Sequence, residues 1–257
     1  MGFESAEHKM VQSEDGSYTA YSTTFEEHYH STRDGALHES LSKHVIPAFK
    51  HHQDKDEITI LDICFGLGFN TLATLYYMKK EGIKKRLRIF SPEFDQELIT
   101  SLPEFQYPFI FDPYLEILTS LSTTGKYEDE DLYIELYIGD ARLYLKECRE
   151  QFDVVYQDAF SPASNPLLWS QEYFKDIASL LKEDGILTTY SMALKTRLAL
   201  HENGFKIYIN AGDGHRDATL ASLSELKGYK LVDMPHKIAC NPDVLSLRDA
   251  DYKESRE

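Results

Sequence analysis

The 257-residue sequence predicts an α/β protein with a mostly parallel sheet of seven strands, an antiparallel edge and a small N-terminal β-hairpin cap. From residue 57 onward, short β-branched and aromatic runs alternate with stretches of helical periodicity. This alternation is typical of parallel strands whose connecting helices cover both faces of a sheet. The last two runs are joined by a short loop, which predicts an antiparallel pair at one edge.

The cap is predicted from the segment "KMVQSEDGSYTAYS", which alternates in polarity around an Asp-Gly turn and is typical of a β-hairpin. We assign residues 1–35 to this cap. A helix is expected to follow, from about Ala36 to the region of Pro47.

The main domain is assigned to residues 36–230. Its predicted strands are 57–64, 85–93, 131–139, 154–158, 185–191, 205–212 and 217–224. Its predicted helical segments are 70–82, 95–122, 141–151, 170–182 and 194–204. Gly82 and Gly204 are expected to end two of these helices. Residues 231–257 are assigned to a C-terminal extension with a frayed end.

Composition limits the classes of function. The net charge of −16 repels nucleic-acid phosphates unless basic residues gather locally, and Lys195, Arg197, His215 and Arg216 are the candidates for such a surface. No stretch is long and apolar enough for a membrane span, and the start lacks the apolar core of a signal peptide. The three cysteines lie far apart without a CxxC pair, which favours a cytoplasmic protein with neither disulfides nor a zinc site.

A glycine-rich loop follows the first strand of the main domain, in "LDICFGLGFN". Gly66 and Gly68 stand where a strand passes into a helix, and glycine there allows unusual dihedrals and close approach of a ligand. Thr71 stands where a dinucleotide GxGxxG motif has its third glycine. The pattern instead matches the methyltransferase form, in which Asp62 is followed by glycines at alternate positions, with Cys64 in place of the first. Asn70 is a further candidate for cofactor contact.

Acids end four successive predicted parallel strands: Asp62, Glu93, Asp140 and Asp158. The carboxyl ends of such strands face the crevice where open α/β sheets bind ligands. Glu93, or less favourably Asp95, is placed to bind the ribose hydroxyls of an adenosine. Asp140, followed by Ala141, is placed to accept from an adenine amino group, although an acid here also serves as a helix N-cap. A ligand with adenosine and no phosphate fits these acids, which predicts S-adenosylmethionine as the cofactor.

The segment "DAFSPASNPLLW" resembles the signature of the MnmC methyltransferase domain. The segments "EHYHSTRDGALHES", "DGILTTYSMALKTRLALHENGF" and "GDGHR" are similar to the same family, so the resemblance runs from about Phe25 to Ser224. It implies a Rossmann-like class I methyltransferase. The implied reaction converts the 5-aminomethyl group of the wobble (2-thio)uridine of tRNA to 5-methylaminomethyl. Many members carry a fused flavin-dependent oxidase for which this chain has no room, so a separate enzyme is expected to make the aminomethyl substrate.

Asp158 is the expected catalytic residue as well as a cofactor contact, because a carboxylate there attracts the incoming ammonium, orients the amine and receives its proton. Phe160 is expected to stack on the base, and Pro162 stiffens the loop. Asn165 and Trp169 either line the substrate pocket or hold the loop down, as a helix cap and a core anchor respectively.

The resemblance implies that the segment "HYHSTRDG" closes over the cofactor, with Tyr29 and Ser31 near the substrate. His28, His30 and Asp34 lie in the same segment, but no further cluster of ligands supports a metal, and none is expected. Arg216 is a candidate phosphate or base contact. His215 stands where the family has a lysine before this arginine.

An aminopropyltransferase of the spermidine-synthase type is the alternative, since "ALHESLSKH" is similar to that family's helix with a His-Glu pair. Two departures disfavour it. The loop reads "CFGLG" where that family has GGGDG, and Ser161 replaces a second aspartate needed for the far amine of a diamine. A sensor that binds the cofactor without catalysis, and a methyltransferase acting on a protein or small molecule, are further alternatives.

Overall fold

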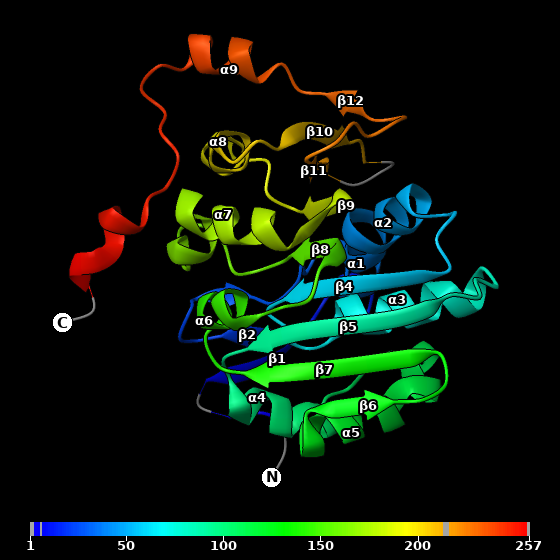
Figure 1. Ribbon diagram of the computed structural model, residues 1–257. Coiled ribbons are helices and arrows are strands. Elements are labelled where there is room, and N and C mark those ends of the chain that lie inside the picture. Colours follow the sequence, from blue (N-terminus) through cyan, green and yellow to red (C-terminus); the bar gives the residue numbers. More distant parts are fainter. Residues whose placement is uncertain (1–2, 6, 213–215, 256–257) are drawn as a thin grey trace.

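A computed structural model describes residues 3–5, 7–212 and 216–255. Within these residues the main sheet has nine strands in the order β12-β10-β11-β9-β8-β4-β5-β7-β6, and helices cover both of its faces (Figure 1). The strands are β4 (Glu57–Ile63), β5 (Arg86–Glu93), β6 (Lys126–Glu128), β7 (Leu132–Ile138), β8 (Phe152–Gln157), β9 (Leu181–Thr189), β10 (Lys206–Asn210), β11 (Ala218–Ser222) and β12 (Lys230–Leu231).

The pairing of the strands confirms the predicted α/β class. β4, β5, β7, β8 and β9 are parallel neighbours, whereas β11 is antiparallel to both β9 and β10. All seven predicted strands are present. The two additional strands, β6 and β12, are antiparallel edge strands of three and two residues, which are too short to produce a recognisable period in the sequence.

Ten helical segments support the sheet in the described part of the chain. They are α1 (Ala36–Ser40), a π-helical turn (Leu41–Val45), α2 (Ile46–His51), α3 (Phe69–Lys80), α4 (Gln96–Ser101), α5 (Leu115–Thr124), α6 (Ala141–Glu147), α7 (Gln171–Leu180), α8 (Leu194–Glu202) and α9 (Met234–Cys240). Short 3-10 turns occur at Leu102–Glu104, Phe109–Tyr114, Pro166–Trp169 and Asp249–Ser255.

Alternate residues of the central strands build two separate cores. Ile58 and Ile60 of β4 pack on the face covered by α1 to α5, and Leu61 and Ile63 pack on the face covered by α6 to α8. Because both faces of β4 are buried, its sequence is a nearly unbroken apolar run that is interrupted only by Thr59 and Asp62.

Two predicted helices differ from the structure, and prolines explain both differences. The first helix continues past Pro47 to His51, because the preceding π-helical turn places Pro47 in the first turn of α2, where its missing N–H costs nothing. The predicted segment 95–122 is divided into α4, two 3-10 turns and α5, since Pro103, Pro108 and Pro113 interrupt it.

The predicted cap forms a separate antiparallel sheet, with β1 (His8–Gln12) paired to β2 (Tyr18–Ser22). A third strand of two residues, β3 (Glu27–His28), pairs with β2 and was not predicted. At the other end of the chain, the Asp249 carboxylate accepts from the Ser170 hydroxyl and contacts Arg142, which docks the chain around Asp249 on the main domain. The end expected to fray, residues 247–257, includes the 3-10 turn Asp249–Ser255, and its last two residues lie outside the described part of the chain. None of the described helices combines the length and apolar character needed to cross a membrane.

Candidate active site

A cavity of about 870 Å³ opens at the carboxyl ends of β4, β5, β7 and β8. Its inner wall comes from the loops after these strands, and its outer wall comes mostly from residues 22–34 of the cap. The volume lies in the range of small-molecule sites. The cavity therefore occupies the edge of the sheet where the strand-end acids were expected to bind a ligand.

The two glycines of the loop after β4 have different roles. Both have positive φ, +55° at Gly66 and +74° at Gly68. Gly66 lines the cavity, and a Cβ there would lie 3.2 Å from Cδ1 of Tyr29. Gly68 begins α3 away from the cavity wall, and a Cβ there would lie 2.8 Å from Cε1 of Phe65. Gly66 thus keeps space open for a ligand, whereas Gly68 is required for packing.

Glu93 lies in the cavity wall with both carboxylate oxygens held by the backbone. Oε2 accepts the N–H of Gly66 at 2.9 Å and Oε1 accepts the N–H of Asp95 at 2.9 Å. Burial raises the pKa of Glu93 above its usual value, and the two N–H donors only partly oppose this. The side chain is therefore fixed at the strand end, in an orientation suited to a neighbouring hydroxyl pair.

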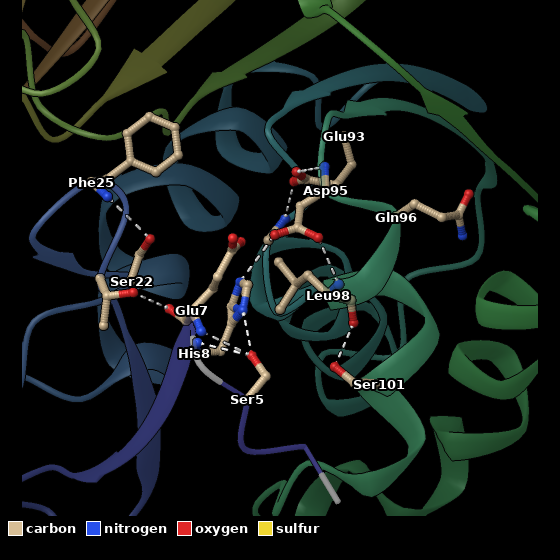
Figure 2. A network of polar contacts seen from close by, with 12 residues as sticks. Ser5, Glu7, His8, Ser22, Phe25, Glu93, Asp95, Gln96, Leu98 and Ser101 are labelled. Atoms are coloured by element: carbon tan, nitrogen blue, oxygen red, sulfur yellow. Dashed lines mark hydrogen bonds and ion pairs between the residues drawn. The ribbon is translucent and has the colours of Figure 1, made fainter. Parts of the chain in front are cut away.

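Asp95 serves mainly to join the cap to the main domain (Figure 2). Its Oδ1 caps α4 by accepting the N–H of Leu98 at 2.8 Å, and its Oδ2 lies 3.2 Å from Nε2 of His8. The same nitrogen of His8 lies 3.0 Å from the hydroxyl of Tyr29. These contacts make Asp95 a less suitable ribose ligand than Glu93.

Asp140 and Ala141 both line the cavity, at the start of α6. The Asp140 carboxylate accepts the N–H of Arg142 at 2.7 Å, so the N-capping alternative for this residue is realised in the structure. The cap uses Oδ1, and the residue remains in the wall beside Gly139.

Asn70 bridges the two aspartates at the ends of β4 and β8. Its Nδ2 lies 3.0 Å from Oδ2 of Asp158 and 3.4 Å from Oδ1 of Asp62. Asp62 is completely buried, lies behind the cavity wall and also accepts from the Thr71 hydroxyl at 3.1 Å. Asp62 therefore supports Asn70 and is not itself among the residues that line the cavity.

The two aspartates differ in ionisation although they share Asn70. Burial and then the charge of Asp158 raise the pKa of Asp62 well above its usual value. Burial by itself would also raise the pKa of Asp158, but His44, His30 and Asn70 together outweigh it and lower the pKa. Asp158, which lines the cavity, is therefore the carboxylate that stays charged.

His44 is the contact of Asp158 that sequence reasoning missed. Its Nε2 lies 3.5 Å from Oδ1 of Asp158, and the side chain is fully buried. The two residues are separated by more than a hundred positions, and no motif in "SKHVIP" signals the contact. Only the packing of the π-helical turn against the ends of β8 and β9 brings them together.

Contacts with the cap hold the loop after Asp158. Phe160 stacks on Phe25 with ring centroids 4.6 Å apart, and the edge of Tyr29 meets it at 4.9 Å. Glu27 accepts the N–H of Ser161 at 2.9 Å and also accepts from the hydroxyl of that residue. Phe25 and Glu27 were not predicted as site residues, and they lie just before the segment 28–35 that was expected to close over the cofactor.

The remaining predicted loop residues either anchor the loop or line the cavity. Trp169 is fully buried, and its Nε1–H donates to the carbonyl of Phe160 at 2.7 Å, which are the contacts expected of a core anchor. Pro162 also lies outside the set of described residues that line the cavity. Asn165 lines the cavity, and its side chain makes no capping hydrogen bond to the 3-10 turn that follows.

Three further predicted contacts lie on the outer wall: Tyr29, Ser31 and Arg216. The N–H of Ser31 donates to Oε2 of Glu39 at 2.7 Å, which ties the cap to α1. Of the expected basic residues, Arg216 and Lys195 are exposed. Arg197 is buried, with Nε donating to Thr219 at 3.1 Å, so it does not contribute to a basic surface. His215 lies outside the described residues.

Among the described residues, a group with the mutual spacing of metal ligands occurs at Glu7, His8 and Asp95, whose ligand atoms lie within 4.8 Å of one another (Figure 2). It differs from the His28, His30 and Asp34 cluster considered from the sequence. The Nε2 of His8 is already shared between a carboxylate and a phenol hydroxyl. The group is accounted for as an ion pair between the cap and α4.

A glycine loop after the first central strand, an acid held at the end of the next strand and a ligand-sized cavity above them define a class I S-adenosylmethionine-dependent methyltransferase. The family described as S-adenosyl-L-methionine-dependent methyltransferase matches residues 109–224. The crystal structure of MnmC2 from Aquifex aeolicus superposes with a TM-score of 0.84 at 32% identity, over 97% of this chain and 81% of that one. The chain therefore belongs to the MnmC-type methyltransferase family.

Two curated relatives are longer than this chain. An uncharacterized protein of Methanocaldococcus jannaschii is 34% identical over 84% of the chain. The tRNA 5-methylaminomethyl-2-thiouridine biosynthesis bifunctional protein MnmC of an Azoarcus species is 31% identical over the same share. The chain spans 59% and 35% of the lengths of these two relatives.

Proposed function

We propose that the protein methylates the 5-aminomethyl group of the wobble uridine, or 2-thiouridine, of tRNA to 5-methylaminomethyl. The observation that carries the proposal is the carboxylate of Asp158 in a cavity that is also lined by the aromatic side chains of Phe25, Tyr29 and Phe160. A carboxylate attracts an ammonium group, and a flat base stacks on aromatic rings. Both features suit an aminomethyl group carried on a pyrimidine.

The cavity fits S-adenosylmethionine, which supplies a methyl group on a positively charged sulfur. Glu93 would hold the ribose hydroxyls, Asp140 and Ala141 would face the adenine, and Gly66 leaves room for the backbone to approach. Two buried atoms, Oδ1 of Asn70 and Nδ1 of His30, have no hydrogen-bond partner among the described residues. Because both side chains line the cavity, they favour a polar ligand group beside Asp158.

Asp158 performs the proton handling that an amine acceptor requires. An alkyl ammonium has no lone pair, so one proton must leave before the nitrogen can attack a methyl group. A carboxylate beside the ammonium binds it, orients one N–H and takes up that proton. The lowered pKa of Asp158 then favours release of the proton to solvent, which restores the carboxylate.

Recognition of tRNA must overcome the net charge of −16. Arg33 and Arg216 are exposed residues of the cavity wall and suit phosphates on either side of an extruded nucleotide. Lys195 is exposed and extends this basic surface. A separate enzyme that produces the aminomethyl group is part of the proposal, as is a cytoplasmic location, where tRNA is modified.

The acids of the outer wall favour a second candidate, aminopropyl transfer to a polyamine. Glu7, Glu27, Asp34 and Glu39 all line the cavity. Two of these are already engaged, because Glu27 accepts from the loop after Asp158 and Glu39 pairs with the buried Lys43. A polyamine would therefore find fewer carboxylates at its far end than the sequence suggests.

The decisive experiment incubates the protein with methyl-labelled S-adenosylmethionine and tRNA from a strain that lacks this modification step. We expect label in the wobble nucleoside, and none with Asp158→Asn, which keeps the shape of the side chain and much of the cofactor affinity. Transfer from decarboxylated S-adenosylmethionine to putrescine, with no labelled tRNA, would favour the second candidate. Cofactor binding without transfer to either acceptor would favour a sensor.

A further inference from the structure

His44 lies in an unusual segment, the π-helical turn Leu41–Val45 between α1 and α2. π-helical turns are rare and are frequently found at functional sites. In this turn His44 is fully buried against Tyr156, with ring centroids 5.5 Å apart. The turn aims an imidazole at the end of β8, where Asp158 begins the substrate loop.

The hydrogen bonds of the ring select its tautomer. Nδ1 of His44 lies 2.8 Å from Oγ1 of Thr188, whereas the carbonyl of Val155, the other acceptor near that hydroxyl, lies 3.5 Å away. Nε2 on the opposite side of the ring faces the Asp158 carboxylate, which can only accept, so the neutral ring keeps its proton there and the hydroxyl of Thr188 donates to Nδ1. The ring proton then resides on Nε2, which faces Asp158.

The Nε2–H of His44 is a buried donor that faces the Asp158 carboxylate. It has no hydrogen-bond partner among the described residues, and Oδ1 of Asp158 lies 3.5 Å away. Catalytic hydrogen bonds are often long before substrate binds and shorten in the complex. The opposite oxygen of the carboxylate is already held by Nδ2 of Asn70 at 3.0 Å.

We infer that His44 is a positioning residue for the proposed methyl transfer. By donating from Nε2 to Oδ1, it clamps the Asp158 carboxylate opposite Asn70, so that the remaining lone pairs point at the amine. Thr188 fixes the donor tautomer from the far side of the ring. The role rests on the proposed function, because it acts through the carboxylate that binds the acceptor.

Other titratable groups around Asp158 enter any pH dependence. They are His30, Asp62, Cys64, Glu39 and Tyr190. Burial raises the pKa of Asp62, Cys64 and Tyr190, and burial lowers the pKa of His30. His44 is the first of the groups that counter the effect of burial on the pKa of Asp158. Its removal should therefore allow that pKa to rise.

The test compares His44→Phe with His44→Gln, whose amide N–H reaches the position of Nε2. The matched control is His52→Phe, which removes another buried histidine that contacts the start of β8, with Nε2 2.9 Å from the carbonyl of Asp153. We expect His44→Phe to lower kcat by about tenfold or more and to move the acidic limb of kcat/KM upward in pH. His44→Gln should restore most of both, and His52→Phe should leave both unchanged. His44→Phe kinetics that match His52→Phe would overturn the inference.

A readout without turnover separates this inference from the proposed function. Side-chain ¹⁵N NMR of the cofactor-free protein should show His44 as the Nε2–H tautomer, with its resonances shifted by Asp158→Asn. An Nδ1–H tautomer, or no response to Asp158→Asn, would refute the clamp even if the protein methylates tRNA. The expected tautomer and response in a protein that fails to methylate tRNA would support the clamp and refute the proposed acceptor. This measurement on the unaltered histidine also holds if His44→Phe does not fold.

Discussion

Glu93→Gln is a sharp perturbation of the cofactor site, because both carboxylate oxygens accept backbone N–H groups. Gly66 donates to one oxygen and Asp95 to the other, each at 2.9 Å. A glutamine must turn its NH₂ group toward one of these donors, which leaves a buried N–H unsatisfied. Such a loss costs about 1–3 kcal/mol, of which part is offset because the substitution also removes a buried charge.

The same change weakens binding of the ribose. Hydrogen bonds to a charged group are stronger than neutral ones by about 1 kcal/mol each, so losing the charge at two hydroxyls costs about 2 kcal/mol. This corresponds to a dissociation constant raised by about thirtyfold. The unsatisfied backbone N–H in Glu93→Gln should separately lower the Tm by roughly 2–8 °C for a domain of this size.

The affinity should also depend on pH through Glu93. Burial raises its pKa above 4.5, so the carboxylate becomes protonated at a higher pH than an ordinary glutamate. The cofactor affinity of the unaltered protein should therefore fall as the pH drops toward that raised value, and Glu93→Gln should abolish this dependence. Calorimetric titration with S-adenosylhomocysteine between pH 5 and pH 8 measures both effects.

Glu128→Gln is the matched control, because Glu128 is exposed on the edge strand β6. It should change neither the affinity nor the pH dependence. A dissociation constant for Glu93→Gln equal to that of the control, with the same pH slope, would refute the assignment of Glu93 to the ribose.

Three other changes test the supports of the site. Trp169→Phe removes the hydrogen bond to the carbonyl of Phe160 and should cost about 1 kcal/mol of stability. The KM for the acceptor should rise several-fold while the cofactor affinity stays unchanged. An unaltered KM in steady-state assays would count against Trp169 as an anchor of the loop. Glu27→Ala frees the loop after Asp158 from the cap, so kcat/KM for tRNA should fall by about tenfold or more. Calorimetry should show little change in cofactor binding. A large loss of cofactor affinity would contradict the role of Glu27 in holding the substrate loop. Burial lowers the pKa of His52 to about 4, so its contribution to stability is present above pH 6.5 and is lost as the pH falls toward 4, by up to roughly 3 kcal/mol. His52→Gln should flatten that decline in urea unfolding at a series of pH values, and an unchanged slope would show that other groups cause it.

The sequence by itself determined the α/β class, the seven main strands and the candidate residues at their ends. These features depend on local patterns: a run of β-branched residues, glycines at a strand-to-helix turn and an acid where an apolar run stops. The segment around Asp158 and Phe160 was also visible locally, because its prolines and asparagine form a continuous motif.

Only the tertiary structure decided which of these residues face the ligand and which support it. Trp169 and Pro162 belong to the same motif as Asp158, yet neither lines the cavity. Glu27 and His44 reach the loop from more than a hundred residues away, through the cap and the π-helical turn. Nothing in a local pattern encodes such contacts, since they depend on how distant elements pack.

Ionisation shows the difference most clearly. Asp62 and Asp158 end adjacent strands and look equivalent in the sequence, but burial raises the pKa of Asp62 while His44 and His30 hold that of Asp158 low. The pKa of a carboxyl group depends on its loss of water and on the charges around it, and both are set by neighbours that folding supplies. The sequence placed the acids at the sheet edge, and the fold determined which one remains charged.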